Sequence, residues 1–355
     1  MHSSRKIPAA RRYAAVFLAC ALSISCCAHA QQSTPEPISP VPLLHISSNL
    51  VLLDVLAAER KTGWLIPHLT ANDFILREDG VPQKISYFSQ NKLPLSIVLL
   101  FDLTESVRPE MKDLAAGALD ALKHLKPEDE VAVMVFSSSA RMLQPFTKDR
   151  AAVAAAIQQA ALMKSGEATF LDEDVYEGAE TALTSTIPDS RRVLVFFTDG
   201  TANFVNPLTR KFYGKQAPAR LHSESEALQR LLESGVVVSA LIDRWAATDA
   251  IIATEAVNPL SYLFGTAPRL NGIERYATQT GGPVLHGSGH RVAEKLAALI
   301  EEIRGRYTIG YVPSSGQPAG KFCRLQLKLK SQAFITHPEL KHGRYIVTTR
   351  AGYYR

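Results

Sequence analysis

Short apolar runs alternate with amphipathic segments through the middle of the chain. One unbroken run covers Ile97–Phe101 and stops at Asp102, and a second covers Val193–Phe197. Runs this short, with many β-branched residues, are typical of strands buried on both faces of a parallel sheet. Between them lie segments with an apolar stripe at helical spacing, such as Pro109–Leu125. The alternation predicts a doubly wound, mostly parallel α/β sheet within residues 94–306.

The expected elements of this unit follow from the same pattern. Strands are expected at 96–102, 131–136, 193–199 and 236–242, and helices at 109–125, 150–163, 172–183, 223–232, 273–280 and 292–303.

Both flanks of this unit show strand patterns instead. Residues 45–93 contain a strand at Leu50–Ala57 and a hairpin closed around Asp79-Gly80. Residues 307–355 contain three more strand patterns, among them Cys323–Lys330. A small isolated sheet is marginally stable and leaves an unburied face. We therefore predict that the two flanks pair into one small β-sandwich, with the α/β unit inserted between them.

The first 30 residues have the pattern of a signal peptide. Four basic residues precede an apolar core at Ala14–Ser25, and Ala28-His29-Ala30 matches a small-x-small cleavage site. The apolar core is too short for a membrane-spanning helix, which needs roughly 20 residues. Lipidation at Cys26 is an alternative, although the residues before it make a poor lipoprotein signal. Residues 31–44 carry four prolines and predict an extended linker.

Cleavage of this peptide would change the composition. The formal charge would fall from +5 to +1, which gives no basic surplus for nucleic acid or an acidic membrane surface. Cys323 would be the one remaining cysteine of four, so an internal disulfide is excluded. These features predict an exported protein (periplasmic, associated with the cell envelope, or secreted) without an integral membrane segment after signal cleavage.

Polar side chains gather where the predicted strands end. Asp102, Thr104 and Ser106 follow the first strand, Asp199 ends another, and Thr169 precedes a predicted helix. Ligands of open α/β sheets bind beyond the carboxyl ends of the strands. Carboxylates and hydroxyls are hard oxygen ligands, the type that Mg²⁺, Ca²⁺ or Mn²⁺ selects. The alternative is a metal-free fold in which these side chains only cap helices and tie loops together.

This set resembles the metal-ion-dependent adhesion site of von Willebrand factor A domains. The family motif is Asp-x-Ser-x-Ser, a Thr from a second loop and an Asp from a third. Thr104 departs from the usual Ser but keeps the hydroxyl, and we expect the unusual Glu105 to point to solvent. The resemblance implies the A-domain fold and a divalent cation, Mg²⁺ first and Ca²⁺ or Mn²⁺ as alternatives. It also implies a protein partner that presents an acidic residue to the ion, and a binding or adhesion function without catalysis.

A second resemblance covers nearly all of the chain after the predicted signal peptide. Residues 68–88 and the pattern Arg304–Pro313 resemble an exported bacterial group first described from acidobacteria. That group is poorly characterised, so the likeness adds little about activity.

Several other features suggest weaker hypotheses. Two insertions, 203–220 and 246–272, carry aromatic residues, the first with basic residues as well, and they either contact a partner or form ordinary long loops. His286 and His290 have possible zinc-ligand spacing, but glycines between them favour a loop. Cys323 is expected to be a small strand residue, not a nucleophile. A P-loop and a Gly-x-Ser-x-Gly elbow are both missing from the sequence. The alternatives to an adhesion module are an envelope scaffold with a degenerate metal site and a metal-dependent hydrolase.

Overall fold

The computed structural model describes most of the chain after residue 49. The described residues are 50–60, 63–90, 93–164, 169–202, 221–242, 269–270, 272–287, 291–314, 318, 320–337, 340 and 345–355. The predicted signal peptide, the Pro-rich segment, the 203–220 insertion and nearly all of the 246–272 insertion lie outside the described residues. Within the described part of the chain, every helix is too short or too polar to cross a membrane.

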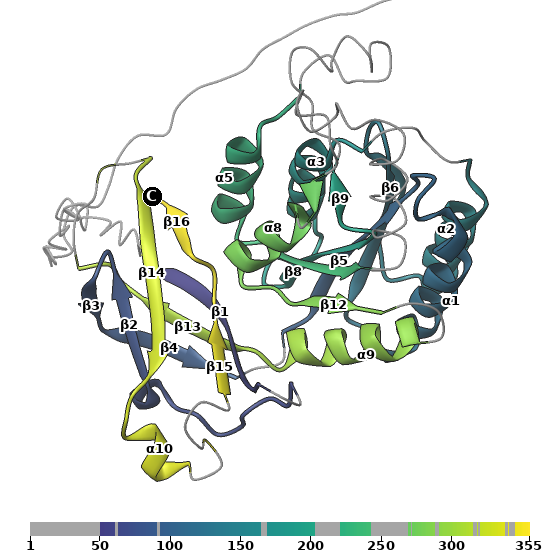
Figure 1. Ribbon diagram of the computed structural model, residues 1–355. Helices are drawn as coiled ribbons and strands as arrows, with labels where there is room; N and C mark the ends of the chain where they lie inside the picture. The colour runs from purple at the N-terminus through teal and green to yellow at the C-terminus, as the bar shows by residue number, and fades with distance from the viewer. Residues whose placement is uncertain are drawn as a thin grey trace, which may run out of the picture. The chain divides into compact units, whose positions relative to one another are not determined.

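A six-stranded sheet forms the centre of the α/β unit (Figure 1). Five of its strands are parallel, and β7 is antiparallel at one edge. Every residue of the central strand β5 is buried, as its unbroken apolar run predicted. The sheet confirms the predicted doubly wound, mostly parallel fold. In spatial order the strands are β12 (Val284–His286), β10 (Val237–Ile242), β8 (Arg191–Thr198), β5 (Leu95–Asp102), β6 (Glu130–Phe136) and β7 (Arg141–Thr147).

Helices cover both faces of this sheet (Figure 1). Alternate residues of β5 point to opposite faces, so Leu99 and Phe101 belong to one core, and Val98 and Leu100 to the other. The first core also takes residues from α1 (Met111–Ala121), α2 (Arg150–Leu162) and α9 (Arg291–Arg304). The second takes residues from α3 (Leu171–Leu183), α5 (Glu224–Ser234) and α8 (Gly272–Thr280). Short 3₁₀ turns at 108–110 and 122–124 extend α1 at its two ends, and β9 (Thr201–Ala202) pairs with β11 (Arg269–Leu270).

The two flanking segments pair with each other, as predicted. One four-stranded sheet has the order β15-β1-β13-β4 and the other β16-β14-β2-β3, so each sheet takes strands from both ends of the chain. Their facing side chains share one core that includes Leu53, Phe74, Tyr307 and Leu325. The strands of either flank would be marginally stable alone, and the shared core stabilises both sheets. The strands are β1 (Val51–Glu59), β2 (Phe74–Glu78), β3 (Val81–Gln83), β4 (Ile85–Ser89), β13 (Tyr307–Tyr311), β14 (Phe322–Leu329), β15 (Tyr345–Thr348) and β16 (Gly352–Tyr354); a short 3₁₀ turn at 71–73 precedes β2, and α10 (Ala333–Thr336) follows β14.

Besides the two-residue strands β9 and β11, three edge strands of the larger sheets were not expected from the sequence. The edge strand β7 contains Pro145 and pairs with β6 in an irregular register, so its sequence lacks a clean alternation. The strands β12 and β16 have only three residues each, too few for a period to be recognised. All three are edge strands, whose pairing depends on the neighbour that the fold supplies.

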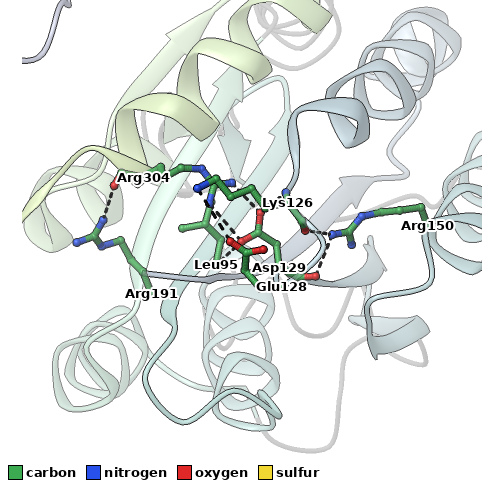
Figure 2. Close-up of polar contacts among 7 residues, drawn as sticks. All are labelled: Leu95, Lys126, Glu128, Asp129, Arg150, Arg191 and Arg304. Carbon is green, nitrogen blue, oxygen red and sulfur yellow. Dashed lines mark hydrogen bonds and ion pairs between the residues drawn. The ribbon is translucent and has the colours of Figure 1, made fainter. Parts of the chain in front are cut away.

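A buried ion pair lies at the amino edge of the six-stranded sheet, the side on which its parallel strands begin (Figure 2). The guanidinium group of Arg304, at the end of α9, donates to both carboxylate oxygens of Asp129, at 2.7 and 3.3 Å. The backbone N–H groups of Leu95 and Lys126 also donate to this carboxylate, at 2.9 and 2.7 Å. Burial by itself raises the pKa of Asp129, but these donors outweigh it and hold the pKa below its usual value.

Arg191, the first residue of β8, joins this edge to the sandwich. Its Nε donates to Asp54 of β1 at 2.7 Å, and its other nitrogens donate to the carbonyl oxygens of Ile303, Arg304 and Arg306. These contacts lie at the amino end of β8. The carboxyl end of that eight-residue strand, roughly 25 Å away, carries the predicted site.

Candidate metal centre

Asp102 is the last residue of β5, and its buried carboxylate accepts three hydrogen bonds. The N–H and the hydroxyl of Thr104 donate to Oδ1 at 2.9 and 2.7 Å. The hydroxyl of Thr198, the last residue of β8, donates to Oδ2 at 2.8 Å. Because β5 and β8 are parallel neighbours, their carboxyl ends meet and bring these side chains together.

The rest of the first loop follows the sequence expectation. The Thr104 and Ser106 hydroxyl oxygens lie 3.2 Å apart, so the alternate positions of the motif face the same point. Glu105, between them, is exposed, as we expected for this residue. The three motif residues therefore form one chain of oxygen atoms that runs from Asp102 through Thr104 to Ser106.

Asp199 follows β8 and is buried beside this chain. Burial first, and the negative charge of Asp199 second, raise the pKa of Asp102 to about 7. Gly200 comes next with φ of +80°, a left-handed conformation that favours glycine, and its N–H donates to the Thr198 hydroxyl at 3.1 Å. The turn thereby keeps Asp199 close enough to Asp102 for the two carboxylates to repel each other.

Thr169 is buried just before α3, next to residues 165–168, which lie outside the described part of the chain. The N–H of its neighbour Phe170 donates to the carbonyl of Ser137, just after β6, at 3.4 Å. Among the described residues, no hydrogen bond joins Thr169 to Asp102. The structure thus brings four of the five predicted residues into contact or close charge interaction, and the place of Thr169 in the same site stays a prediction.

A further buried carboxylate, Asp174, was missed from the sequence. It lies in the first turn of α3 with 0% exposure, and neither of its carboxylate oxygens has a hydrogen-bond partner among the described residues. Burial first, and Asp102 second, raise its pKa well above the usual value. The available signal was an acidic run, Asp172-Glu173-Asp174, at the start of the helix predicted at 172–183.

The structure separates the roles of these three acids. Asp172 accepts a hydrogen bond from the Tyr276 hydroxyl of α8 at 2.7 Å. Glu173 accepts from the backbone N–H of His222 at 2.7 Å, and the imidazole of His222 stacks on Tyr176. Asp172 and Glu173 therefore connect α3 to the neighbouring helices. Asp174 is left buried near Asp102, where an unpaired carboxylate is costly.

The donor set suits a hard divalent cation in its chemistry. It combines buried carboxylates with hydroxyls, and the charges that act on Asp102 and Asp174 are all negative. Across the described residues, no three or more His, Cys, Asp or Glu side chains are arranged to hold a metal ion by themselves. The fit therefore depends on the hydroxyl oxygens of Thr104, Ser106 and Thr169. A cation here would offset the repulsion between Asp102, Asp199 and Asp174.

The weaker sequence candidates have structural explanations where they are described. The Nε2 atom of His286, in β12, lies 3.7 Å from a carboxylate oxygen of Glu274, while His290 lies outside the described residues. Cys323 is a buried residue of β14, and burial raises the pKa of its thiol. A buried thiol with a raised pKa is a poor nucleophile, which agrees with its expected role as a small strand residue.

Comparison with known proteins identifies the α/β unit. Residues 97–201 match the family model of the von Willebrand factor type A domain. Over these residues the chain is similar to von Willebrand factor type A domains. The matched segment begins in β5, ends in β9 and contains all five residues of the predicted site, together with Asp174.

Solved structures resemble this chain at low identity. BatB from Bacteroides thetaiotaomicron is 15% identical with a TM-score of 0.40, over 59% of this chain and 97% of that protein. A von Willebrand factor type A protein from Catenulispora acidiphila is 13% identical with a TM-score of 0.42, over 80% of this chain and 71% of that one. The PilB minor pilin from Streptococcus sanguinis is 13% identical with a TM-score of 0.40, over 61% and 63% of the two chains. A search of curated proteins found no match.

Proposed function

We propose that this protein is an exported binding module whose A domain engages an acidic residue of a protein partner through a bound divalent cation. A domains of this type are protein-interaction or adhesion modules. The observation that carries the proposal is the acidic centre around Asp102: in the described part of the chain, Asp174 is buried without a hydrogen-bond partner, and the charges that raise the pKa of Asp102 and Asp174 are carboxylates. Such a centre is best stabilised by a cation, because uncompensated buried carboxylates are costly.

Asp102, Thr104, Ser106, Thr169 and Asp199 would hold the ion, directly or through water, with Mg²⁺ as the first choice. A hard cation with an incomplete protein shell keeps water ligands, and a carboxylate of a partner can replace one of them. In this proposal, the residues of this chain position the oxygen atoms and bury the ion from one side. Export by the N-terminal segment and membership of the bacterial exported group are part of the same proposal.

The ion itself can be tested without a partner. Saturating Mg²⁺ should raise the melting temperature of the full chain by several degrees, because a ligand that binds only the folded state stabilises it by mass action. Asp199→Ala should abolish this increment, whereas Asp113→Asn, at an exposed aspartate on α1, should retain it. The same Mg²⁺ response in Asp199→Ala and wild type would place the ion elsewhere. A wild type without any response would favour the scaffold with a degenerate site.

The partner requires a second experiment. Wild type and Asp102→Ala would be used to capture proteins from an envelope extract of the producing cells, in Mg²⁺ and in chelator. We expect a protein that is retained by wild type in Mg²⁺ and lost both in chelator and with Asp102→Ala. Retention that ignores Mg²⁺ would contradict a cation bridge.

A further inference from the structure

A second cavity lies at the opposite edge of the six-stranded sheet from the metal centre. Its volume is about 560 Å³, within the usual range of roughly 300–1,000 Å³ for small-molecule sites. Its walls come from the sandwich strands β1, β4 and β13, from the start of β8, and from the segment between α5 and β10. Sites for small molecules often form where two such units meet.

The sandwich contributes the face of its sheet that points away from the sandwich core. Leu53 and Val55 of β1 belong to that core, so Leu52 and Asp54 face outward. Across the sheet, Leu52 pairs with Gly310, and Gly310 pairs with Tyr87. Leu52 is 50% exposed and lies in the part of β1 that pairs with β13 but not with β15.

The opposite wall is also apolar. It consists of Leu231 and Leu232 at the end of α5, and Val236 and Val237 at the start of β10. These four side chains are at most 3% exposed, so the accessible apolar surface of the cavity is that of Leu50, Leu52 and Tyr87 on the sandwich side. An accessible apolar surface rimmed by charged groups marks a binding site more often than an isolated exposed residue does.

Three arginines line the cavity, and within the described part of the chain only Arg191 has a carboxylate partner. Arg191 is bonded to Asp54 at 2.7 Å. Arg350 donates only to the carbonyl oxygens of Leu52 and Leu232, at 3.0 and 3.2 Å, and its Nε is buried without a partner. Arg192 donates to the carbonyl of Pro188 at 3.5 Å, and its Nε is likewise buried and unpartnered.

The net charge of the lining therefore favours the binding of an anion. The three arginines face two acids, Asp54 and the exposed Asp189, which leaves one net positive charge. Neither Arg192 nor Arg350 forms an ion pair with any described residue. A guanidinium group binds a carboxylate through two parallel N–H donors, and it does so more strongly where apolar walls exclude water.

We propose that this cavity binds an amphipathic carboxylate, a medium-chain fatty acid in the simplest case. The carboxylate head would lie between Arg192 and Arg350, and the apolar chain would lie against Leu52 and Tyr87, which are 50% and 44% exposed. The site is independent of the cation, because it lies at the amino edge of the sheet and shares no residue with the metal centre.

The test is the binding of dodecanoate to the full chain, measured by isothermal titration calorimetry below its micelle concentration. We expect one saturable site per chain. Arg192→Gln and Leu52→Gln should each weaken binding by tenfold or more, since the first removes the charge and the second the apolar wall. Arg192 is preferred to Arg350 for this purpose because Arg350 also holds β1 against α5.

Matched controls separate this site from non-specific adsorption. Arg324→Gln and Leu162→Gln change an exposed arginine on β14 and a leucine on α2 that is 81% exposed, and both should bind within twofold of wild type. Butyrate, which has the charge without the chain, and dodecanol, which has the chain without the charge, should bind at least tenfold more weakly. The proposal is overturned if dodecanoate does not saturate a site, if Arg192→Gln or Leu52→Gln binds like wild type, if a control variant loses binding equally, or if dodecanol equals dodecanoate.

Discussion

At the scale of single residues, the buried carboxylates at the amino and carboxyl edges of the six-stranded sheet have opposite electrostatic surroundings. At the amino edge, Asp129 is paired with Arg304 and accepts further backbone hydrogen bonds. At the carboxyl edge, Asp102 accepts hydrogen bonds only from neutral donors, and two other carboxylates lie near it. The ion pair of Asp129 holds the loop before β6 in place. The carboxylates around Asp102 leave negative charge that a cation could offset.

Loss of the ion pair at the amino edge should be strongly destabilising. Arg304→Met removes the guanidinium group from a pair in which both side chains are nearly inaccessible, and it leaves Asp129 with an uncompensated charge. We expect the free energy of unfolding to fall by about 3–5 kcal/mol. Urea unfolding would measure the loss, with the exposed Arg324→Met as a control that should change stability by less than about 0.5 kcal/mol. Equal losses in the two variants would contradict this role for Asp129.

The raised pKa of Asp102 predicts an unusual dependence of stability on pH. Between its ordinary pKa of 3.8 and about 7, the folded protein keeps a proton that the unfolded chain has released. Stability contributed by this group therefore falls as the pH rises through that window. Asp102→Asn does not titrate there, so in chelator its stability relative to wild type should rise from pH 4 to pH 7 by up to about 1.4 kcal/mol per pH unit and level off above. Urea unfolding at five pH values would show this trend, and a flat difference would contradict it.

At the scale of elements, close helix packing positions the layers around the sheet. Gly117 of α1 lies against Val292 of α9, and an added Cβ atom would come within 2.3 Å of the Val292 side chain. Both helices belong to the same core, and α9 leads directly to the Arg304 pair. The approach of these two helices therefore affects the loop that joins the α/β unit to β13.

Gly117→Ala tests this packing, because the variant is stabilised if the helices can separate and destabilised if they cannot. In an exposed helix, alanine is more stable than glycine by about 0.5–1 kcal/mol. Here the added methyl group overpacks the contact with Val292, which costs about 1–3 kcal/mol. We expect a net loss of stability in thermal unfolding. A more stable variant would mean that α1 and α9 separate easily at this point.

At the scale of the whole molecule, the sandwich depends on strands that are about 250 residues apart in the sequence. Leu76 of β2 pairs with Leu327 of β14, and Val55 of β1 pairs with Tyr307 of β13. Neither flank can complete its sheets without the other.

Removal of residues 314–355 should therefore unfold one part of the molecule and leave another intact. The hairpin β2–β3 would lose β14, its partner strand, together with the cover of Phe74 and Leu76. We expect limited proteolysis to cut within residues 74–83, while the α/β unit, which has two cores of its own, stays resistant. Mass spectrometry of the fragments would locate the cuts. A hairpin that remains protected would mean that the sandwich does not depend on the C-terminal strands.

The local pattern of the sequence was enough to predict the α/β order, the pairing of the two flanks and the position of Asp102, Thr104 and Ser106 after β5. The first and the last of these features follow from period and from residue type, which act between near neighbours. The pairing of the flanks was predicted because each set of strands would leave an unburied face on its own. The short edge strands β7, β12 and β16 were not predictable, because only a partner strand stabilises them. Asp174 was missed for a related reason: a carboxylate at the start of a helix normally faces solvent, and only the packing of α3 against the end of β5 buries it near Asp102. The cavity at the amino edge could not be predicted from the sequence either. Leu52, Arg192 and Arg350 line it together only after the last strands of the chain pair with the first.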